Sequence, residues 1–144
     1  MSHSPTHPKN YRARQWLVDL TGCDPSLLGK PARLRELVLE GVRRGGATAV
    51  TDQFHQAEIL TGTVIMPSGR LAIQAWPTTG AVTLDIVDAV SDNEESGSLD
   101  FGAVVEFLRD MLRATDLQKS DVFRGETRPH VAPAEFMTEG AWLQ

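Results

Sequence analysis

Two amphipathic helices, separated by a run of alternating strands, are the feature that most constrains the fold of this chain. Apolar residues recur at helical spacing over 32–44 and form a second stripe over 101–112, where Asp100 is placed to cap the helix. Between them, 71–76 (LAIQAW) and 81–89 (AVTLDIVDA) alternate in polarity, as half-buried strands do. Each helix has only one apolar stripe, so both must pack against an apolar sheet face.

The order of the predicted elements defines a fold class. A strand over 14–20 and a turn-rich connection precede the first helix, and a short strand over 120–125 follows the second. Strand, helix, three or four strands, helix, strand is an α+β pattern. It predicts a two-layer sandwich in which a mainly antiparallel sheet carries two helices on one face. The opposite face, which includes Gln74 and Trp76, is then left to solvent or to a partner.

One domain is predicted over residues 13–125, between a flexible arm (1–12) and a C-terminal tail (126–144) in which Phe136 and Trp142 are candidates for docking. The chain has 144 residues and is 41% hydrophobic, enough for a core, and its net charge of −5 disfavours nucleic acid. No apolar run approaches the roughly 18 residues of a membrane span, and the first ten residues lack the apolar core of a signal peptide. We therefore expect a cytoplasmic protein that binds neither nucleic acid nor membrane.

Metal chemistry is not expected. A single cysteine, Cys23, excludes an intrachain disulfide and a multi-cysteine metal site. The four histidines are scattered, and no pair has helical metal-ligand spacing. Cys23 is interpreted as a structural, partly buried thiol, with a catalytic thiol as the alternative. His55 is interpreted as a hydrogen-bonded structural residue.

Three strings of the sequence resemble the prokaryotic S-adenosylmethionine decarboxylases. They are LVDLTGCDPSLL (17–28), GATAVTDQFH (46–55) and LAIQAWPTTGAVTLDI (71–86). The resemblance implies a self-processing, pyruvoyl-dependent enzyme. In this family a serine attacks the preceding carbonyl, the chain splits, and the serine becomes a pyruvoyl group that accepts electrons during decarboxylation. A histidine and a second serine assist processing, and a cysteine donates a proton.

This chain departs from the family at the reactive residues. In an ungapped frame fixed on Trp76-Pro77, the positions matching the assisting serine, the glutamate before the nucleophile, the nucleophilic serine, the processing histidine and the cysteine are Thr61, Ser68, Gly69, Gln74 and Ala89. Glycine can neither attack the backbone nor become pyruvoyl, and glutamine cannot move a proton near neutral pH. The sequence thus predicts no catalytic residue among these positions and no cofactor, with a pyruvoyl group only if Ser68 is processed.

Two main functions follow from this pattern. The first is a non-processing relative that acts as a regulatory or ligand-binding subunit, linked to polyamine metabolism by resemblance only. It would pair with itself or with an active family member, because a sheet covered on one side has a face to bury. A small-molecule ligand is expected, with Asp19, Trp76 and Asp85 as pocket candidates.

The second function is an active decarboxylase, for S-adenosylmethionine or another amino acid. A bulge before the strand would move Ser68 into the place of the nucleophile. Alternatively, chemistry would be rebuilt on Asp19, Cys23 or Asp85. A scaffold that borrows only the fold is a third possibility. The ungapped frame fixed on Trp76-Pro77 also predicts that Gly69→Ser together with Gln74→His restores partial self-cleavage.

Overall fold

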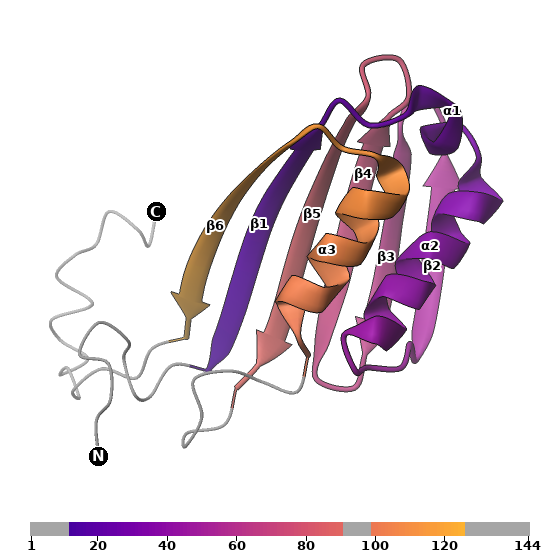
Figure 1. Cartoon of the computed structure of the whole chain (residues 1–144). Helices are drawn as coiled ribbons and strands as arrows, with labels where there is room; N and C mark the ends of the chain where they lie inside the picture. The colour runs from indigo at the N-terminus through magenta and orange to yellow at the C-terminus, as the bar shows by residue number, and fades with distance from the viewer. Residues whose placement is uncertain (1–11, 91–98, 126–144) are drawn as a thin grey trace, which may run out of the picture.

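The computed structural model describes residues 12–90 and 99–125 of the chain. In these ranges the elements are β1 (Ala13–Thr21), α1 (Pro25–Leu28), α2 (Pro31–Arg44), β2 (Thr51–Gln56), β3 (Leu60–Met66), β4 (Gly69–Trp76), β5 (Ala81–Ala89), α3 (Phe101–Leu112) and β6 (Asp116–Arg124) (Figure 1). The predicted arm before residue 12, residues 91–98 and the predicted tail from residue 126, with Phe136 and Trp142, lie outside the described residues.

The strands form one antiparallel sheet in the order β2-β3-β4-β5-β1-β6 (Figure 1). Consecutive strands from β2 to β5 form hairpins, whereas β1 pairs with β5 and β6 on its two sides. The first strand of the chain therefore lies inside the sheet. The α+β class and the mainly antiparallel sheet predicted from the sequence are confirmed.

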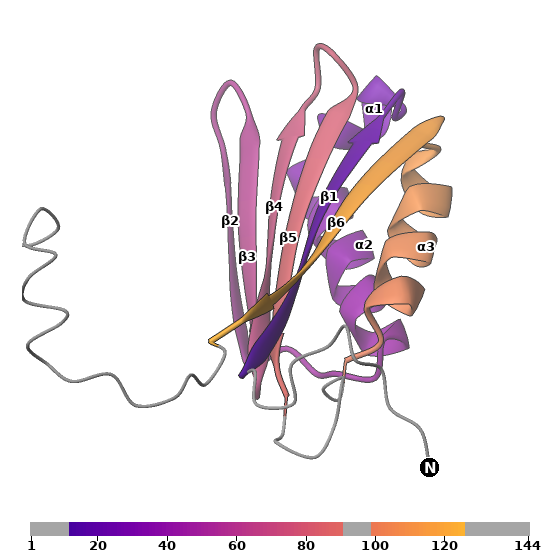
Figure 2. The same cartoon turned by 90° about the vertical axis from the view of Figure 1, so that its left-hand side faces the viewer.

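Helices α2 and α3 cover one face of the sheet, and no described helix covers the other (Figure 2). We call these the helix face and the open face. The helices bury the predicted stripes, namely Leu34, Leu37, Val38 and Val42 of α2 and Phe101, Val104, Val105, Leu108 and Leu112 of α3. Met111, which the sequence also placed in the stripe, is 36% exposed on the outer side of α3. No helix in the described ranges is long and apolar enough to cross a membrane.

Local sequence signals explain where the longer helices begin and end. The Asp100 carboxylate accepts a 3.0 Å hydrogen bond from the Ala103 amide, which is the predicted cap of α3. Helix α2 begins with Pro31, whose missing N–H costs nothing in the first turn. It ends before Gly45-Gly46, and Gly46 has a φ of 93°, a conformation that glycine adopts without strain.

The largest differences from the sequence prediction are helix α1 and the start of strand β6. The connection after β1 contains the one-turn helix α1, which is too short for an apolar period; Asp24 caps it through the Ser26 amide at 3.0 Å. Strand β6 begins at Asp116, four residues before the predicted start. Apart from Leu117, its first half carries polar side chains at the sheet edge, so the alternation that marks a half-buried strand is missing there.

Candidate functional site

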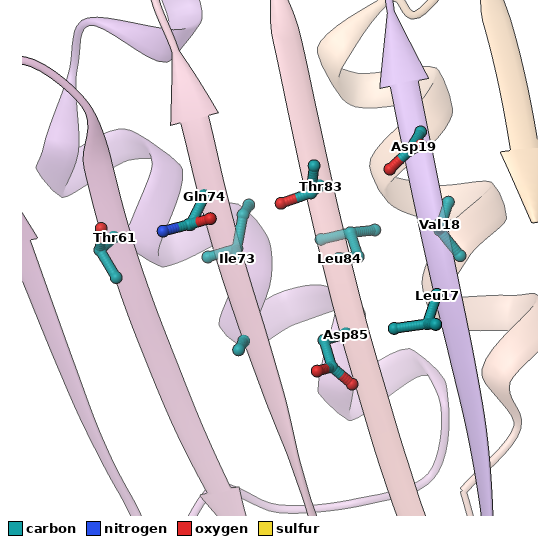
Figure 3. A pocket seen from close by; sticks show the side chains of 10 residues that line it. Leu17, Val18, Asp19, Thr61, Ile73, Gln74, Thr83, Leu84 and Asp85 are labelled. Atoms are coloured by element: carbon teal, nitrogen blue, oxygen red, sulfur yellow. The ribbon is translucent and has the colours of Figure 1, made fainter.

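The open face of the sheet contains a shallow cavity of about 320 Å³ that spans strands β1, β5, β4 and β3 (Figure 3). Its lining includes two carboxylates, three neutral polar side chains and an apolar one: Asp19, Asp85, Thr61, Gln74, Thr83 and Leu17. Several of these residues were separate candidates in the sequence. The cavity is therefore the place where the structure brings them together.

The register of the strands explains this gathering. Thr61 lies opposite Gln74, Gln74 lies opposite Thr83, and Thr83 lies opposite Asp19, so one polar row crosses four strands. Side chains of a strand alternate between the two faces, and all four residues fall on the open one (Figure 3). Asp85 follows two residues after Thr83 on the same face and makes a diagonal pair with Asp19, roughly 7 Å apart by strand geometry.

The cavity has an acidic character. Asp19 is exposed and Asp85 is half-buried, and no basic residue lines the cavity among the described residues. The Oδ1 atom of Asp85 accepts a 2.8 Å hydrogen bond from Gln15 Nε2. In turn, Gln15 Oε1 accepts a 2.9 Å hydrogen bond from Arg124 Nη1. Such a cavity favours a ligand with positive charge.

Gln15 supports the site through Asp85 without lining the cavity, and its local sequence gives no sign of this role. Its side chain is only 7% exposed, although it lies on the open face. A lone glutamine in an otherwise apolar and charged strand gives no local signal, because its partners Asp85 and Arg124 are 70 and 109 residues away. Only the sheet register reveals them.

Trp76, the third predicted pocket residue, does not line the cavity. It lies at the end of β4 opposite Ala81 and shares the open face with Gln74, as the alternation predicted. Likewise, Ala89 lies at the end of β5, four residues beyond Asp85. The structure thus separates these two positions from the polar row.

The segment that matches the self-cleaving site forms a tight hairpin between β3 and β4. Met66 and Gly69 pair across the turn, and Gly69 also lies opposite Asp88 of β5. Ser68 Oγ donates a 2.6 Å hydrogen bond to Asp88 Oδ1, and the Ser68 carbonyl accepts from the Ala89 amide at 2.8 Å. The described residues of β3 and β4 pair in a regular register up to Met66 and Gly69, without the bulge that would move Ser68 into the place of the nucleophile.

Asp88 fastens this hairpin to the start of α3. Its side chain is only 2% exposed, and its second oxygen, Oδ2, accepts a 3.0 Å hydrogen bond from the Leu99 amide. A buried carboxylate needs such donors, because burial without them is costly. The Ser68 hydroxyl therefore serves as one of the donors that stabilise Asp88.

Gly69 leaves no room for a side chain. A Cβ atom built there would lie 2.1 Å from the Val87 carbonyl oxygen and 3.0 Å from Asp88 Cα, both of them backbone atoms. The pyruvoyl group of the family forms from a serine, so the residue at this position does not fit that group. No reaction step in this chain can be assigned to a pyruvoyl group at position 69.

The two positions that the sequence frame assigns to the nucleophile and to the processing histidine lie on different faces of β4. Gly69 lies on the same side of β4 as the buried Leu71, which is the helix face, whereas Gln74 lies on the open face (Figure 3). Five residues of strand separate them, roughly 16 Å. In this chain the two positions belong to different surroundings.

The two remaining sequence candidates, Cys23 and His55, do not line the cavity. Cys23 is buried, burial raises the pKa of its thiol, and its amide donates to the Gly80 carbonyl at 2.9 Å. These features fit the structural interpretation, since a reactive thiol needs a lowered pKa. His55, which was expected to be a hydrogen-bonded structural residue, is instead exposed on edge strand β2, opposite Thr61. The described ranges hold no group of three or more potential metal ligands among His, Cys, Asp and Glu.

The fold and the site define a two-layer α+β protein with an acidic cavity on the open face of its sheet. The model of one family, S-adenosylmethionine decarboxylase, matches residues 14–125, which is nearly the whole of the described domain. The chain belongs to the S-adenosylmethionine decarboxylase family.

Individual relatives are distant. The chain is 26% identical over 112 residues to an S-adenosylmethionine decarboxylase proenzyme of Thermococcus gammatolerans, covering 76% of this chain and 74% of the relative. It is 23% identical to one of Caldicellulosiruptor saccharolyticus, over 78% and 87% of the two chains. The crystal structure of the adenosylmethionine decarboxylase from Aquifex aeolicus is similar with a TM-score of 0.69 at 21% identity, covering 85% of this chain and 98% of that one. The similarity to the Aquifex aeolicus structure supports the two-layer α+β fold of this chain.

Proposed function

We propose that this chain is a non-processing member of the family that binds a small cationic ligand and serves as a regulatory or ligand-binding subunit in polyamine metabolism. The observation that carries the proposal is Gly69. Where the family has the serine that becomes the pyruvoyl group, this chain has a glycine pressed against the β5 backbone. Ser68, the neighbouring hydroxyl, is held by the buried Asp88.

The proposed ligand is S-adenosylmethionine or a close relative of it. The names of the related proteins specify this molecule, and its sulfonium carries a permanent positive charge. Two carboxylates on the cavity wall, Asp19 and Asp85, would attract that charge, and Leu17 and Ala72 offer apolar contact. At about 320 Å³ the cavity has a volume at the lower end of those that hold small molecules.

Binding without turnover is the expected result. We expect the purified protein to bind S-adenosylmethionine labelled in its carboxyl group, measured by equilibrium dialysis, and to release no labelled carbon dioxide. The physical reason is that the cavity supplies charge complementarity but no electrophile to accept electrons. Release of carbon dioxide above a heat-treated control would contradict the proposal, and so would the absence of binding at millimolar ligand.

Pairing through the open face is the second part of the proposal. Leu17 is 43% exposed and Ile65 is 39% exposed on this face, whose reverse side is covered by both helices (Figure 2). We propose that a second copy of this chain, or an active family member, covers it. A dimer would bury these apolar side chains and enclose the cavity.

We expect sedimentation to show a dimer, and Ile65→Lys to shift the protein toward monomer because it places a charge in the buried interface. Ile65 lies outside the cavity lining, so the ligand contacts stay in place. Met111→Lys is the matched control, since Met111 is similarly exposed but lies on α3. A wild type that stays monomeric at all concentrations, alone and mixed with an active relative, would rule out this part of the proposal.

A further inference from the structure

We propose that Gln15 is the positioning residue of the ligand cavity and that it gives the cavity its preference for a positively charged ligand by holding the Asp85 carboxylate. This inference rests on the proposed function, since it assumes that the cavity binds a ligand. The inference concerns Gln15, which lies outside the cavity lining, and it explains how Asp85 recognises the charge of the ligand.

The hydrogen bonds of Gln15 have a fixed direction. Arg124 can only donate, so the Gln15 oxygen faces Arg124 and the Gln15 nitrogen faces Asp85. The amide donates to Oδ1 of Asp85 at 2.8 Å, and no other described residue hydrogen-bonds to Oδ2. The carboxylate is therefore held by one oxygen, while Asp85 lines the cavity (Figure 3).

Because Gln15 is neutral and lies between Arg124 and Asp85, the negative charge of Asp85 remains available to a ligand. The guanidinium of Arg124 is joined to Asp85 through Gln15, and Asp85 takes part in no ion pair within the described residues. A direct pair between Arg124 and Asp85 would neutralise the carboxylate that faces the cavity. Gln15 occupies the space between them and is only 7% exposed in doing so. Because a buried amide is costly unless it is bonded, this side chain keeps its two partners in place.

The test compares two ligands that differ at one centre. S-adenosylmethionine carries the sulfonium charge, and S-adenosylhomocysteine is the neutral thioether. The ratio of their dissociation constants, measured by calorimetry on the full-length chain, reports recognition of that charge. We expect the wild type to prefer the sulfonium by about tenfold, which corresponds to about 1.4 kcal/mol. Asp85→Asn should bring the ratio close to one.

Gln15→Met is expected to lower the preference about fivefold, because it removes the donor to Asp85 and lets Arg124 approach the carboxylate. In the Asp85→Asn background the same change should have no further effect, since Gln15 acts through Asp85. Gln15→Asn keeps the polar amide, but its side chain is one methylene too short to reach both partners, so it should behave like Gln15→Met. This variant replaces Gln15→Met in the test if the methionine variant does not fold. Gln53→Met, on the open face of edge strand β2 and outside the cavity, is the matched control and should leave the ratio unchanged.

The outcomes separate this inference from the proposed function. If the wild type binds neither ligand, both are overturned. If it binds and prefers the sulfonium, but both Gln15 variants keep the ratio, Gln15 is a structural residue and the inference alone fails. The inference would also be overturned if Gln15→Met lowered the ratio of dissociation constants equally in the wild-type and Asp85→Asn backgrounds.

Discussion

Gly69→Ser is expected to lower the free energy of unfolding by about 2 to 3 kcal/mol and to yield no cleavage products. The new Cβ would meet the Val87 carbonyl oxygen at 2.1 Å, and that oxygen belongs to the backbone of a central strand. Relief requires β4 and β5 to move apart, which disturbs the ladder and the buried carboxylate of Asp88. For a chain of this length the loss corresponds to a melting temperature lower by roughly 6 to 10 °C.

The matched control is Gly29→Ser. Gly29 has a negative φ, and a Cβ there would find its nearest neighbour, the Pro25 carbonyl oxygen, at an ordinary 3.8 Å. This variant should unfold within about 0.5 kcal/mol of the wild type. Denaturant unfolding of both variants decides the point. A Gly69→Ser variant as stable as Gly29→Ser would show that the hairpin has room for a side chain and would contradict the close packing of Gly69 against β5.

The structure changes what is expected of a restored site. The sequence frame predicts that Gly69→Ser with Gln74→His recovers partial self-cleavage. In the structure, position 69 is on the helix face and position 74 is on the open face, roughly 16 Å along the strand. A serine at 69 would place its Cβ 2.1 Å from the Val87 carbonyl oxygen, so it cannot take up an attacking position without moving β5. We therefore expect the double variant to stay intact over a day, like the single one.

The elements that are best predicted from the sequence are those whose apolar residues keep a regular spacing from end to end. Helix α3 and strand β5 have the predicted bounds, because each carries an unbroken apolar pattern over its whole length. Helix α1 has one turn, and β6 lies at the edge of the sheet, so neither shows a full pattern. Local sequence carries too little information about such elements.

The site was predictable only in its parts. The sequence predicts Asp19 and Asp85 as pocket residues and offers Thr61 and Gln74 only as positions matching the family site. Their assembly around one cavity depends on the cross-strand register. Register is set by packing between strands that are distant in sequence, so it cannot be read from one strand alone. The same holds for Asp88, whose role as the partner of Ser68 follows from the pairing of β4 with β5.

The most direct test of the central claim is the intact mass of the purified wild-type chain. We predict one uncut polypeptide of 15.8 kDa, unchanged after a day at 37 °C, because Gly69 cannot attack and the Ser68 hydroxyl is engaged by Asp88. Two fragments, 1–67 and 68–144, with the second beginning in a pyruvoyl group, would show that Ser68 is the nucleophile and that the protein is a self-processing enzyme.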